Sequence, residues 1–516
     1  MILLWFIIIL MAGGILAWIA EKWNADLSRW ISFLALSINF VIAVMIWSQH
    51  DFISIEPNSV WIADYAVNWI PVFGISFHLA MDGLSLLMLI LTFFLGMLSV
   101  LTSWKEIQFK VGFFHFNLLW VLAGITGVFL TMDLFLFYFF WEVMLIPMYF
   151  LIGIWGHENR RYAAYKFFIF TQASGLLMLL AILGIYFIHG NVTGTYTFDY
   201  FQLLNTPFEP GMARWLMLGF LVAFIVKLPV VPFHTWLPDA HSQAPTAGSL
   251  ILAGLLLKTG AYGILRFVIP LFPDAAHDIS KWAMLFGVIG ILYGALLAFS
   301  QTDLKRLVAY TSVSHMGFVL LGVFAFNELA LQGVIMQMIT HGISTGALFI
   351  LAGSVYERIH TRDITQMGGY WKKAPFMGFI AIVFVMASLG LPGLGNFVAE
   401  FLILVGAWNS THILTILATT GLVGATAYSL RIMQRVFYGT EIKSNHAFED
   451  LSLREKLMMV PLVLVIVWLG FFPQPILNTS KIPVMNVIEA QSNTRKENVA
   501  LEKLNTNEVL KGDNHE

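Results

Sequence analysis

Residues 376–408 read FMGFIAIVFVMASLGLPGLGNFVAEFLILVGAW. These 33 residues contain one charged side chain, Glu400, and two apolar halves that meet at the sequence LPGLG. About 20 mostly apolar residues suffice for a helix to cross the hydrocarbon core of a bilayer, so the stretch predicts a membrane-spanning helix. Proline has no amide hydrogen and clashes with the preceding helical turn. The helix is therefore expected to break at Pro392 and Gly393.

The whole chain has the same composition as this stretch. Of its 516 residues, 59% are hydrophobic and 11% are charged, whereas soluble proteins carry about 25% charged residues. The net charge of −2 provides no basic surface for nucleic acid. The absence of cysteine excludes disulfides, thiol nucleophiles and cysteine-bound iron–sulfur clusters. We therefore expect an all-α, polytopic membrane protein.

Stretches of about 20 mostly apolar residues predict about fourteen transmembrane helices. The first is interpreted as a retained helix, because no Lys or Arg precedes it and no signal-peptide cleavage site follows. The polar residues 476–516 are expected to form a C-terminal tail that is flexible or lies along a partner. The predicted spans are residues 2–20, 29–48, 81–102, 114–132, 133–155, 166–188, 215–233, 243–270, 282–300, 305–325, 330–355, 376–408, 412–437 and 456–473.

Positive charges are distributed unevenly between the two sides of this arrangement. We number each loop after the span that it follows. Of the 28 Lys and Arg residues, 18 lie in or beside odd-numbered loops and three in or beside even-numbered loops. Cytoplasmic loops carry the excess of Lys and Arg in membrane proteins. The pattern places the odd-numbered loops in the cytoplasm and both termini outside.

A second interrupted helix is predicted in the seventh span. There the sequence KLPVVP at 227–232 contains two helix breakers, Pro229 and Pro232. Broken helices at corresponding positions of two halves indicate a transporter site. The two breaks are five spans apart, an odd number, so the second copy must cross the membrane in the opposite sense. This predicts two inverted five-helix repeats. The expected units are residues 1–113, 114–270 (first repeat), 282–437 (second repeat), 456–473 and 476–516.

Six ionisable side chains are expected to lie deep in the membrane. Each charge at the bilayer centre costs about 2.5–3.5 kcal/mol on insertion scales, so such groups persist only where they pair or meet water. An ionisable residue at this depth is therefore first interpreted as part of a path for ions or protons. We expect this path to run through Glu142, Lys227, Lys258, His315, His341 and Glu400.

Each of these residues also has a structural alternative. Glu142 and Lys227 would form a fixed ion pair that joins two helices. Lys258 would bind carbonyls of a distorted helix, and the two histidines would be satisfied core groups. Glu400 would cap a half-helix. The cluster His234, Asp239 and His241 fits no zinc spacing and is expected at the cytoplasmic mouth. No metal or cofactor site is predicted, since the chain contains neither G-x-G-x-x-G nor a Walker A sequence.

Residues 227–267 read KLPVVPFHTWLPDAHSQAPTAGSLILAGLLLKTGAYGILRF. This stretch resembles the antiporter-like, proton-translocating membrane subunits of bacterial NADH:quinone oxidoreductase (respiratory complex I), and among them the M subunits. Four further stretches carry the same resemblance: FWEVMLIPMYFLIGIWG at 140–156, QTDLKRLVAYTSVSHMGFV at 301–319, LPGLGNFVAEF at 391–401 and GFFPQPIL at 470–477.

The resemblance implies fourteen helices with two inverted repeats, and it assigns all six ionisable residues to family positions. The glutamate of the fifth helix falls on Glu142 and the lysines of the seventh and eighth on Lys227 and Lys258. The histidines of the tenth and eleventh fall on His315 and His341, and the acid of the twelfth on Glu400.

The resemblance further implies a subunit of a proton-translocating enzyme in the bacterial cytoplasmic (inner) membrane. Protons would move through this chain, driven by quinone reduction elsewhere in the complex. L and N homologues would flank the chain, and the periplasm would hold both termini. FMN and iron–sulfur clusters would belong to other subunits.

Two other interpretations remain at this point. One is a subunit of a multi-subunit Na⁺/H⁺ antiporter or of a proton-pumping hydrogenase, which share the Lys and Glu pattern. HSQAPTAGS at 241–249 and RFVIPLFP at 266–273 favour complex I over these. The other is a passive scaffold, in which the buried charges could be neutralised without consequence.

Overall fold

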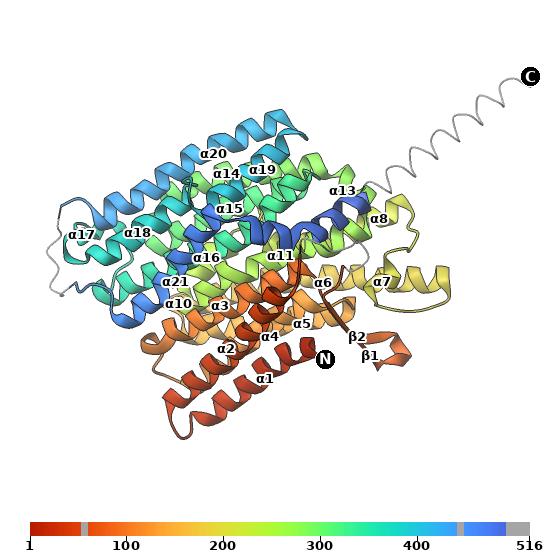
Figure 1. Ribbon diagram of the computed structural model, residues 1–516, viewed down its shortest axis with the longest axis horizontal. Coiled ribbons are helices and arrows are strands. Elements are labelled where there is room, and N and C mark those ends of the chain that lie inside the picture. Colours follow the sequence, from red (N-terminus) through yellow and green to blue (C-terminus); the bar gives the residue numbers. More distant parts are fainter. Residues whose placement is uncertain (53–59, 441–447, 492–516) are drawn as a thin grey trace, which may run out of the picture.

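Long helices that lie side by side along the longest axis make up most of the molecule (Figure 1). The computed structural model describes residues 1–52, 60–440 and 448–491. The long helices are α1 (Ile2–Ala20), α2 (Ala25–Gln49), α3 (Gly83–Glu106), α4 (Val111–Leu130), α5 (Leu134–Trp155), α6 (Arg160–Thr193), α8 (Pro210–Lys227), α14 (Ser280–Ser300), α15 (Leu304–Val323), α16 (Glu328–Ile359), α20 (His412–Ile432) and α21 (Leu453–Phe471).

Within the described residues, twelve helices are long and apolar enough to cross a membrane: the long helices named above other than α21, and the helix Thr246–Leu271. A thirteenth span is added if α21 and the helix Gln474–Gln491 that follows it, bent by 70°, count as one. Two shorter apolar helices, α18 (Pro375–Ser388) and α19 (Gly395–Trp408), occupy the predicted twelfth span. The fold is therefore a polytopic helical bundle, as the apolar windows predicted.

The chain leaves the helical conformation at both interrupted spans. Helix α8 ends at Lys227, and α9 (Trp236–Gln243) begins only after the segment that contains Pro229 and Pro232. Helix α18 ends before Pro392 and α19 begins after Gly393, whose backbone φ of +93° suits glycine. Each break therefore leaves a half-helix end inside the bundle.

The eighth span is a third irregular element, which the sequence did not predict. It runs from Thr246 to Leu271 and contains two π-helical turns, η2 (Leu252–Leu256) and η3 (Ile264–Val268). Between them lies α11 (Leu257–Gly263), with α10 (Thr246–Ile251) and α12 (Ile269–Leu271) at the two ends. π-Turns are rare and often mark functional sites.

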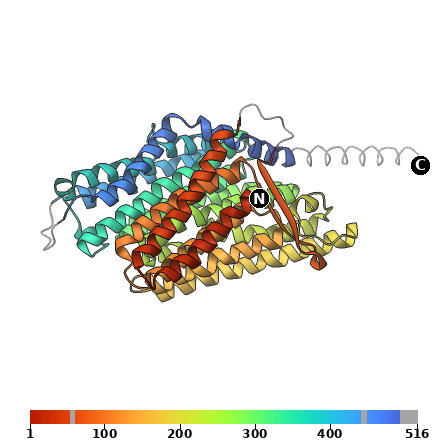
Figure 2. The same cartoon turned by 60° about the horizontal axis from the view of Figure 1, so that its bottom comes forward.

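A β-hairpin precedes α3 and was also not predicted. Strands β1 (Ala63–Ile70) and β2 (Ile75–Met81) pair antiparallel through the turn η1 (Pro71–Phe73). The hairpin lies at the same end of the bundle as the N-terminus (Figure 2), which we call the hairpin end. Gly74 is required in its turn, because φ is +65° and a Cβ atom would lie 2.0 Å from the Tyr196 carbonyl oxygen.

Residues 474–491 differ from the expected polar tail. They form a helix that packs on this chain itself. Trp47 Nε1 donates to Thr479 Oγ1 at 2.9 Å, and Gln491 Nε2 donates to the Pro273 carbonyl at 2.9 Å. Ile476 and Val484 are buried, so apolar residues spaced along this helix explain its attachment. The rest of the predicted tail, from residue 492, lies outside the described residues.

His78 fastens the hairpin to the bundle. Its Nδ1 lies 2.5 Å from Asp199 Oδ2, at the N-terminus of α7 (Tyr200–Leu203), and its Nε2 lies 3.1 Å from Asp64 Oδ2. Burial alone would lower the pKa of His78, but hydrogen bonds to the two carboxylates raise it above the ordinary 6.5. Charged His78 therefore joins β1, β2 and α7.

We expect His78→Leu to lower the melting temperature more at pH 6 than at pH 9. Because the folded-state pKa is raised, the charged histidine contributes its full stabilisation below pH 6.5 and loses it as the pH rises through the folded value. Thermal unfolding of the purified protein at both pH values measures this difference. A loss of stability that is equal at the two pH values would contradict a charged contact.

Candidate functional site

Lys258 lies in α11 between the two π-turns, and its side chain is fully buried. Its Nζ donates to the Ala253 carbonyl in η2 at 2.5 Å and lies 2.7 Å from Nδ1 of His341, in α16. The carbonyl contact is the arrangement expected for a lysine that satisfies a distorted helix. The histidine contact adds a titratable partner, so Lys258 belongs to a polar chain as well as to its own helix.

His341 continues this chain towards α15 and α19. Its ring centroid lies 5.6 Å from that of His315, and His315 Nδ1 lies 2.9 Å from Glu400 Oε1. All three side chains are at least 97% buried. Four of the six predicted residues therefore form one continuous buried series, in the order Lys258, His341, His315 and Glu400.

Three neutral side chains surround the Glu400 end of this series. Gln337 Nε2 donates to Glu400 Oε1 at 3.3 Å. Ser388 Oγ lies 3.1 Å and Tyr428 Oη 3.3 Å from His315 Nε2. Both ring nitrogens of His315 are thus occupied, and the ring is held towards Glu400. These three residues were not predicted, because neutral polar residues are common in membrane helices and carry no signal by themselves.

Lys227 and Glu142 form a second, separate group. Lys227 is the last residue of α8, and its side chain is 1% exposed. Its Nζ lies 5.0 Å from the centroid of the Trp141 ring and 5.5 Å from that of Phe167. Nζ has no hydrogen-bond partner among the described residues. The direct ion pair with Glu142, which was the structural alternative for these two residues, is not present in the described part of the chain.

Glu142 is bound by uncharged groups instead. Gln172 Nε2, in α6, donates to its Oε1 at 3.2 Å, and Tyr138 also hydrogen-bonds to the carboxylate. Glu142, unlike Lys227, is partly exposed on the outside of the chain. Lys227 and Glu142 are still close enough to interact electrostatically. They therefore influence each other through space without touching.

Helix packing brings the two groups together. Gly260, two residues after Lys258, faces the end of α8, where a Cβ atom would lie 2.6 Å from the Phe224 carbonyl oxygen and 3.0 Å from the Leu228 nitrogen. Only a glycine allows this approach, because the atoms opposite belong to the backbone. The break after Lys227 therefore lies against the helix that carries Lys258.

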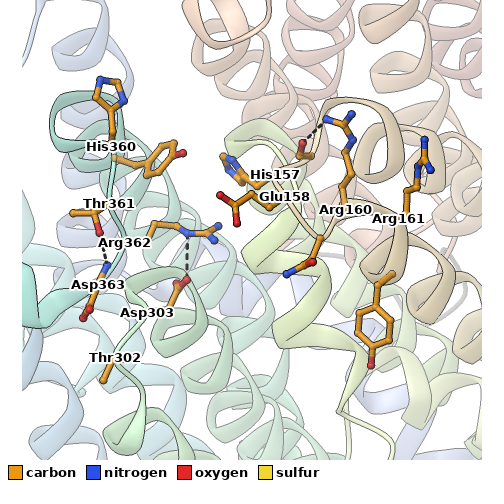
Figure 3. A pocket seen from close by; sticks show the side chains of 14 residues that line it. His157, Glu158, Arg160, Arg161, Thr302, Asp303, His360, Thr361, Arg362 and Asp363 are labelled. Atoms are coloured by element: carbon orange, nitrogen blue, oxygen red, sulfur yellow. Dashed lines mark hydrogen bonds and ion pairs between the residues drawn. The ribbon is translucent and has the colours of Figure 1, made fainter.

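A polar cavity of about 1020 Å³ lies at the end of the bundle opposite the hairpin. Figure 3 shows its two walls. One is the segment formed by residues 157–162, which includes the α5–α6 loop and the first turn of α6. The other contains Asp303 and Arg362, which form an ion pair at 3.2 Å. Burial and the nearby charges of Lys305 and Arg362 lower the pKa of His157 to about 3, so its ring is neutral at physiological pH.

The residues His234, Asp239 and His241 do not form a common site. Asp239 pairs with Lys166 at 2.7 Å and with Arg306 at 2.6 Å. His241 stacks on Phe349 at 4.5 Å. No group of three or more His, Cys, Asp or Glu side chains in the described part of the chain could hold a metal ion.

Comparisons with known proteins agree with this architecture. The family described as NADH:quinone oxidoreductase/Mrp antiporter, transmembrane, matches residues 131–425. NADH-quinone oxidoreductase subunit M of Pseudomonas aeruginosa is 55% identical over 93% of this chain and 96% of that subunit. Subunit M of Escherichia coli K12 is 53% identical over 94% of this chain and 97% of that subunit.

Solved structures give the same result. A chain of respiratory complex I from Thermus thermophilus has a TM-score of 0.85 and 29% identity, and the match covers 95% of this chain and all of that one. A chain of the Mrp complex from Dietzia has a TM-score of 0.83 at 22% identity, covering 95% and 98%, which shows the fold alone. The chain therefore belongs to the family of antiporter-like membrane subunits of NADH:quinone oxidoreductases and Mrp antiporters. Within it, the chain aligns over nearly its whole length with M subunits.

We expect Gly260→Ala to lower the free energy of unfolding by about 1–3 kcal/mol, the usual cost of overpacking a core. The new methyl group would force α11 away from α8, because the Phe224 carbonyl cannot move independently. Denaturant unfolding of the purified protein measures the change. Gly211→Ala, in the open first turn of α8, is the matched control, since nothing lies within 4 Å of its Cβ position. Equal stability of the two variants would contradict the close packing.

Proposed function

We propose that this chain is the M-type membrane subunit of a proton-translocating NADH:quinone oxidoreductase, respiratory complex I. Its end-to-end similarity to M subunits at 53–55% identity supports this assignment. The chain takes part in an enzyme as a proton-moving subunit. Flavin and iron–sulfur clusters belong to other subunits of the complex, and quinone reduction elsewhere supplies the energy.

The proposed proton path uses the six predicted residues, with Glu142 acting on Lys227 and the other five carrying the proton. Lys227 loads a proton from the cytoplasmic side and passes it to Lys258. From there it moves through His341 and His315 to Glu400, which releases it on the other side. The single observation that carries this path is the continuous series from Lys258 to Glu400, with contacts of 2.7 Å and 2.9 Å at its two ends.

The energy scale of the proposed mechanism is modest. Moving one proton against 100 mV costs about 2.3 kcal/mol. A unit charge 4 Å away contributes about 4 kcal/mol at an effective dielectric constant of 20. Doubling such a separation halves this energy, a change of about 2 kcal/mol, which is comparable with the cost of one transfer. This coupling is conformational or electrostatic, since the redox centres lie in other subunits.

We further propose the orientation and the neighbours. The end opposite the hairpin faces the cytoplasm, because the odd-numbered loops there carry most of the Lys and Arg residues. Both termini then lie in the periplasm. Residues 114–270 and 282–437 act as two inverted halves. Glu142 is partly exposed, and a carboxylate that faced lipid would be costly. A flanking L or N homologue covers it.

An Mrp-type Na⁺/H⁺ antiporter subunit is the second candidate function. The Dietzia chain shares the fold with this protein. The sequence identity to M subunits is more than twice as high as to that chain, which favours complex I. Co-purification of the chain with flavin-containing and iron–sulfur subunits from native membranes tests the assignment, and isolation without them would overturn it.

We expect Lys227→Ala and Glu142→Ala to assemble into the complex but to lose most of the proton pumping that is coupled to NADH oxidation. Either change removes one charge of the proposed switch. Proton uptake or release by membrane vesicles, measured with a pH-sensitive dye and normalised to NADH oxidation, gives the result. Lys372→Ala, which removes an exposed cation in α17 (Tyr370–Lys373), is the matched control. Wild-type pumping by either variant would contradict the switch.

Lys258→Ala should also block transfer, because it removes the group that links the break of α8 to His341. The same vesicle assay applies. Lys258→Arg is the informative companion variant: it keeps a cation but cannot release the proton at physiological pH, so it should be as inactive as the alanine variant. Full proton pumping by the Lys258→Ala variant would show that the protons do not pass through Lys258.

A further inference from the structure

The ammonium group of Lys227 has an unusual environment for a buried charge. Its Nζ has no hydrogen-bond partner among the described residues, although an unpaired buried charge is costly. What faces it are two aromatic rings, Trp141 of α5 at 5.0 Å and Phe167 of α6 at 5.5 Å. A cation within about 6 Å of a ring centroid is attracted by the ring, most strongly by tryptophan.

The two rings are held firmly in place by their neighbours. Trp141 packs against Phe137 at 5.8 Å and against Phe224 at 5.6 Å. Phe167 packs against Trp236 at 5.4 Å. Trp141 is 1% exposed and Phe167 is fully buried, so neither ring can turn away without disturbing the core.

The lysine is also fixed with respect to these rings. Trp236 Nε1 donates to the Val226 carbonyl at 2.9 Å and so ties the residue before Lys227 to the segment after the break. The aromatic residue that supports Phe167 therefore also anchors the end of α8. Rings and ammonium belong to one packed unit built from α5, α6 and α8.

We propose that Trp141 and Phe167 form an aromatic cage that holds the protonated form of Lys227 apart from Glu142. In this assignment the two rings are positioning residues for the proton carrier. Glu142, bound by Gln172 and Tyr138, acts on the caged ammonium through space. The inference deepens the proposed function, because it takes Lys227 as the first proton-carrying group.

Lys258 provides an internal comparison. Its Nζ is satisfied by hydrogen bonds to Ala253 and His341. Lys227 and Lys258 thus stabilise their charge in different ways, one on aromatic faces and one on polar atoms. Loss of an aromatic ring should therefore affect Lys227 and leave Lys258 unchanged.

The test is pH-dependent acetylation of lysine in the assembled complex, with acetic anhydride as the membrane-permeant probe. Only an uncharged amine reacts, and mass spectrometry reports Lys227 and Lys258 separately. The measured quantity is the labelling at pH 7 divided by the labelling at the alkaline plateau, which removes differences in accessibility. For Lys227, Trp141→Leu should raise this ratio and lower the pH of half-maximal labelling by about 0.4–1.5, the range that corresponds to one cation–π contact.

Further variants separate the cage from a general packing defect. Phe167→Leu should raise the Lys227 ratio as well, whereas Trp141→Phe, which keeps a ring, should restore most of the wild-type value. Phe93→Leu is the matched control, since it removes a buried ring that stacks on Phe6 at 5.4 Å. It should leave both lysines unchanged. Glu142→Gln should raise the Lys227 ratio as well, because it removes the negative charge that acts on the ammonium through space.

An unchanged Lys227 ratio in both leucine variants would overturn the cage, and so would an equal rise for Phe93→Leu. The result is separate from the pumping assay. If the ratio rises as expected while Lys227→Ala pumps normally, the cage stands and the proposed proton path fails.

Discussion

The structure depends on one constraint, which is the free-energy cost of placing ionisable side chains inside a bundle of mostly apolar helices. A buried charge or polar group must find a partner in the protein, because the surrounding medium offers none. The chain meets this requirement in two ways. Lys258, His341, His315 and Glu400 lie beside one another in a buried series, and the ammonium of Lys227 faces two aromatic rings.

The irregular backbone of the bundle follows from the same constraint. A regular helix uses all its carbonyls internally and leaves none for a side chain. In the π-turn η2, the Ala253 carbonyl accepts a hydrogen bond from the Lys258 side chain. The breaks after Lys227 and around Pro392 bring half-helix ends into the bundle. Irregular segments at membrane depth are tolerated where protein surrounds them, and here they coincide with the titratable residues.

Much of this could be predicted from the sequence. Apolar windows gave the positions of the long helices, because the thickness of the bilayer fixes their length. The positions of Pro229 and Pro392 gave both interruptions, since the steric effect of proline is local. Lys258 and Glu400 stood out as single charges in apolar runs. Each of these signals lies within a short stretch of chain.

What could not be predicted depends on contacts between distant segments. The hairpin is held by His78, which joins residues more than a hundred positions apart in the sequence. Gln337, Ser388 and Tyr428 became visible only when α15, α16, α18, α19 and α20 were brought together. The environment of Lys227 was also missed: charge pairing predicted a direct contact with Glu142, but packing placed the rings of Trp141 and Phe167 at the ammonium.

Trp141 and Glu142 are consecutive residues of α5, and this has a geometric consequence. Successive side chains on a helix point about 100° apart, so the indole and the carboxylate cannot both face Lys227 at once. A roll of α5 about its own axis that carries the carboxylate inward would carry the indole away. The rotational setting of α5 about its axis therefore determines which of the two side chains acts on the Lys227 ammonium.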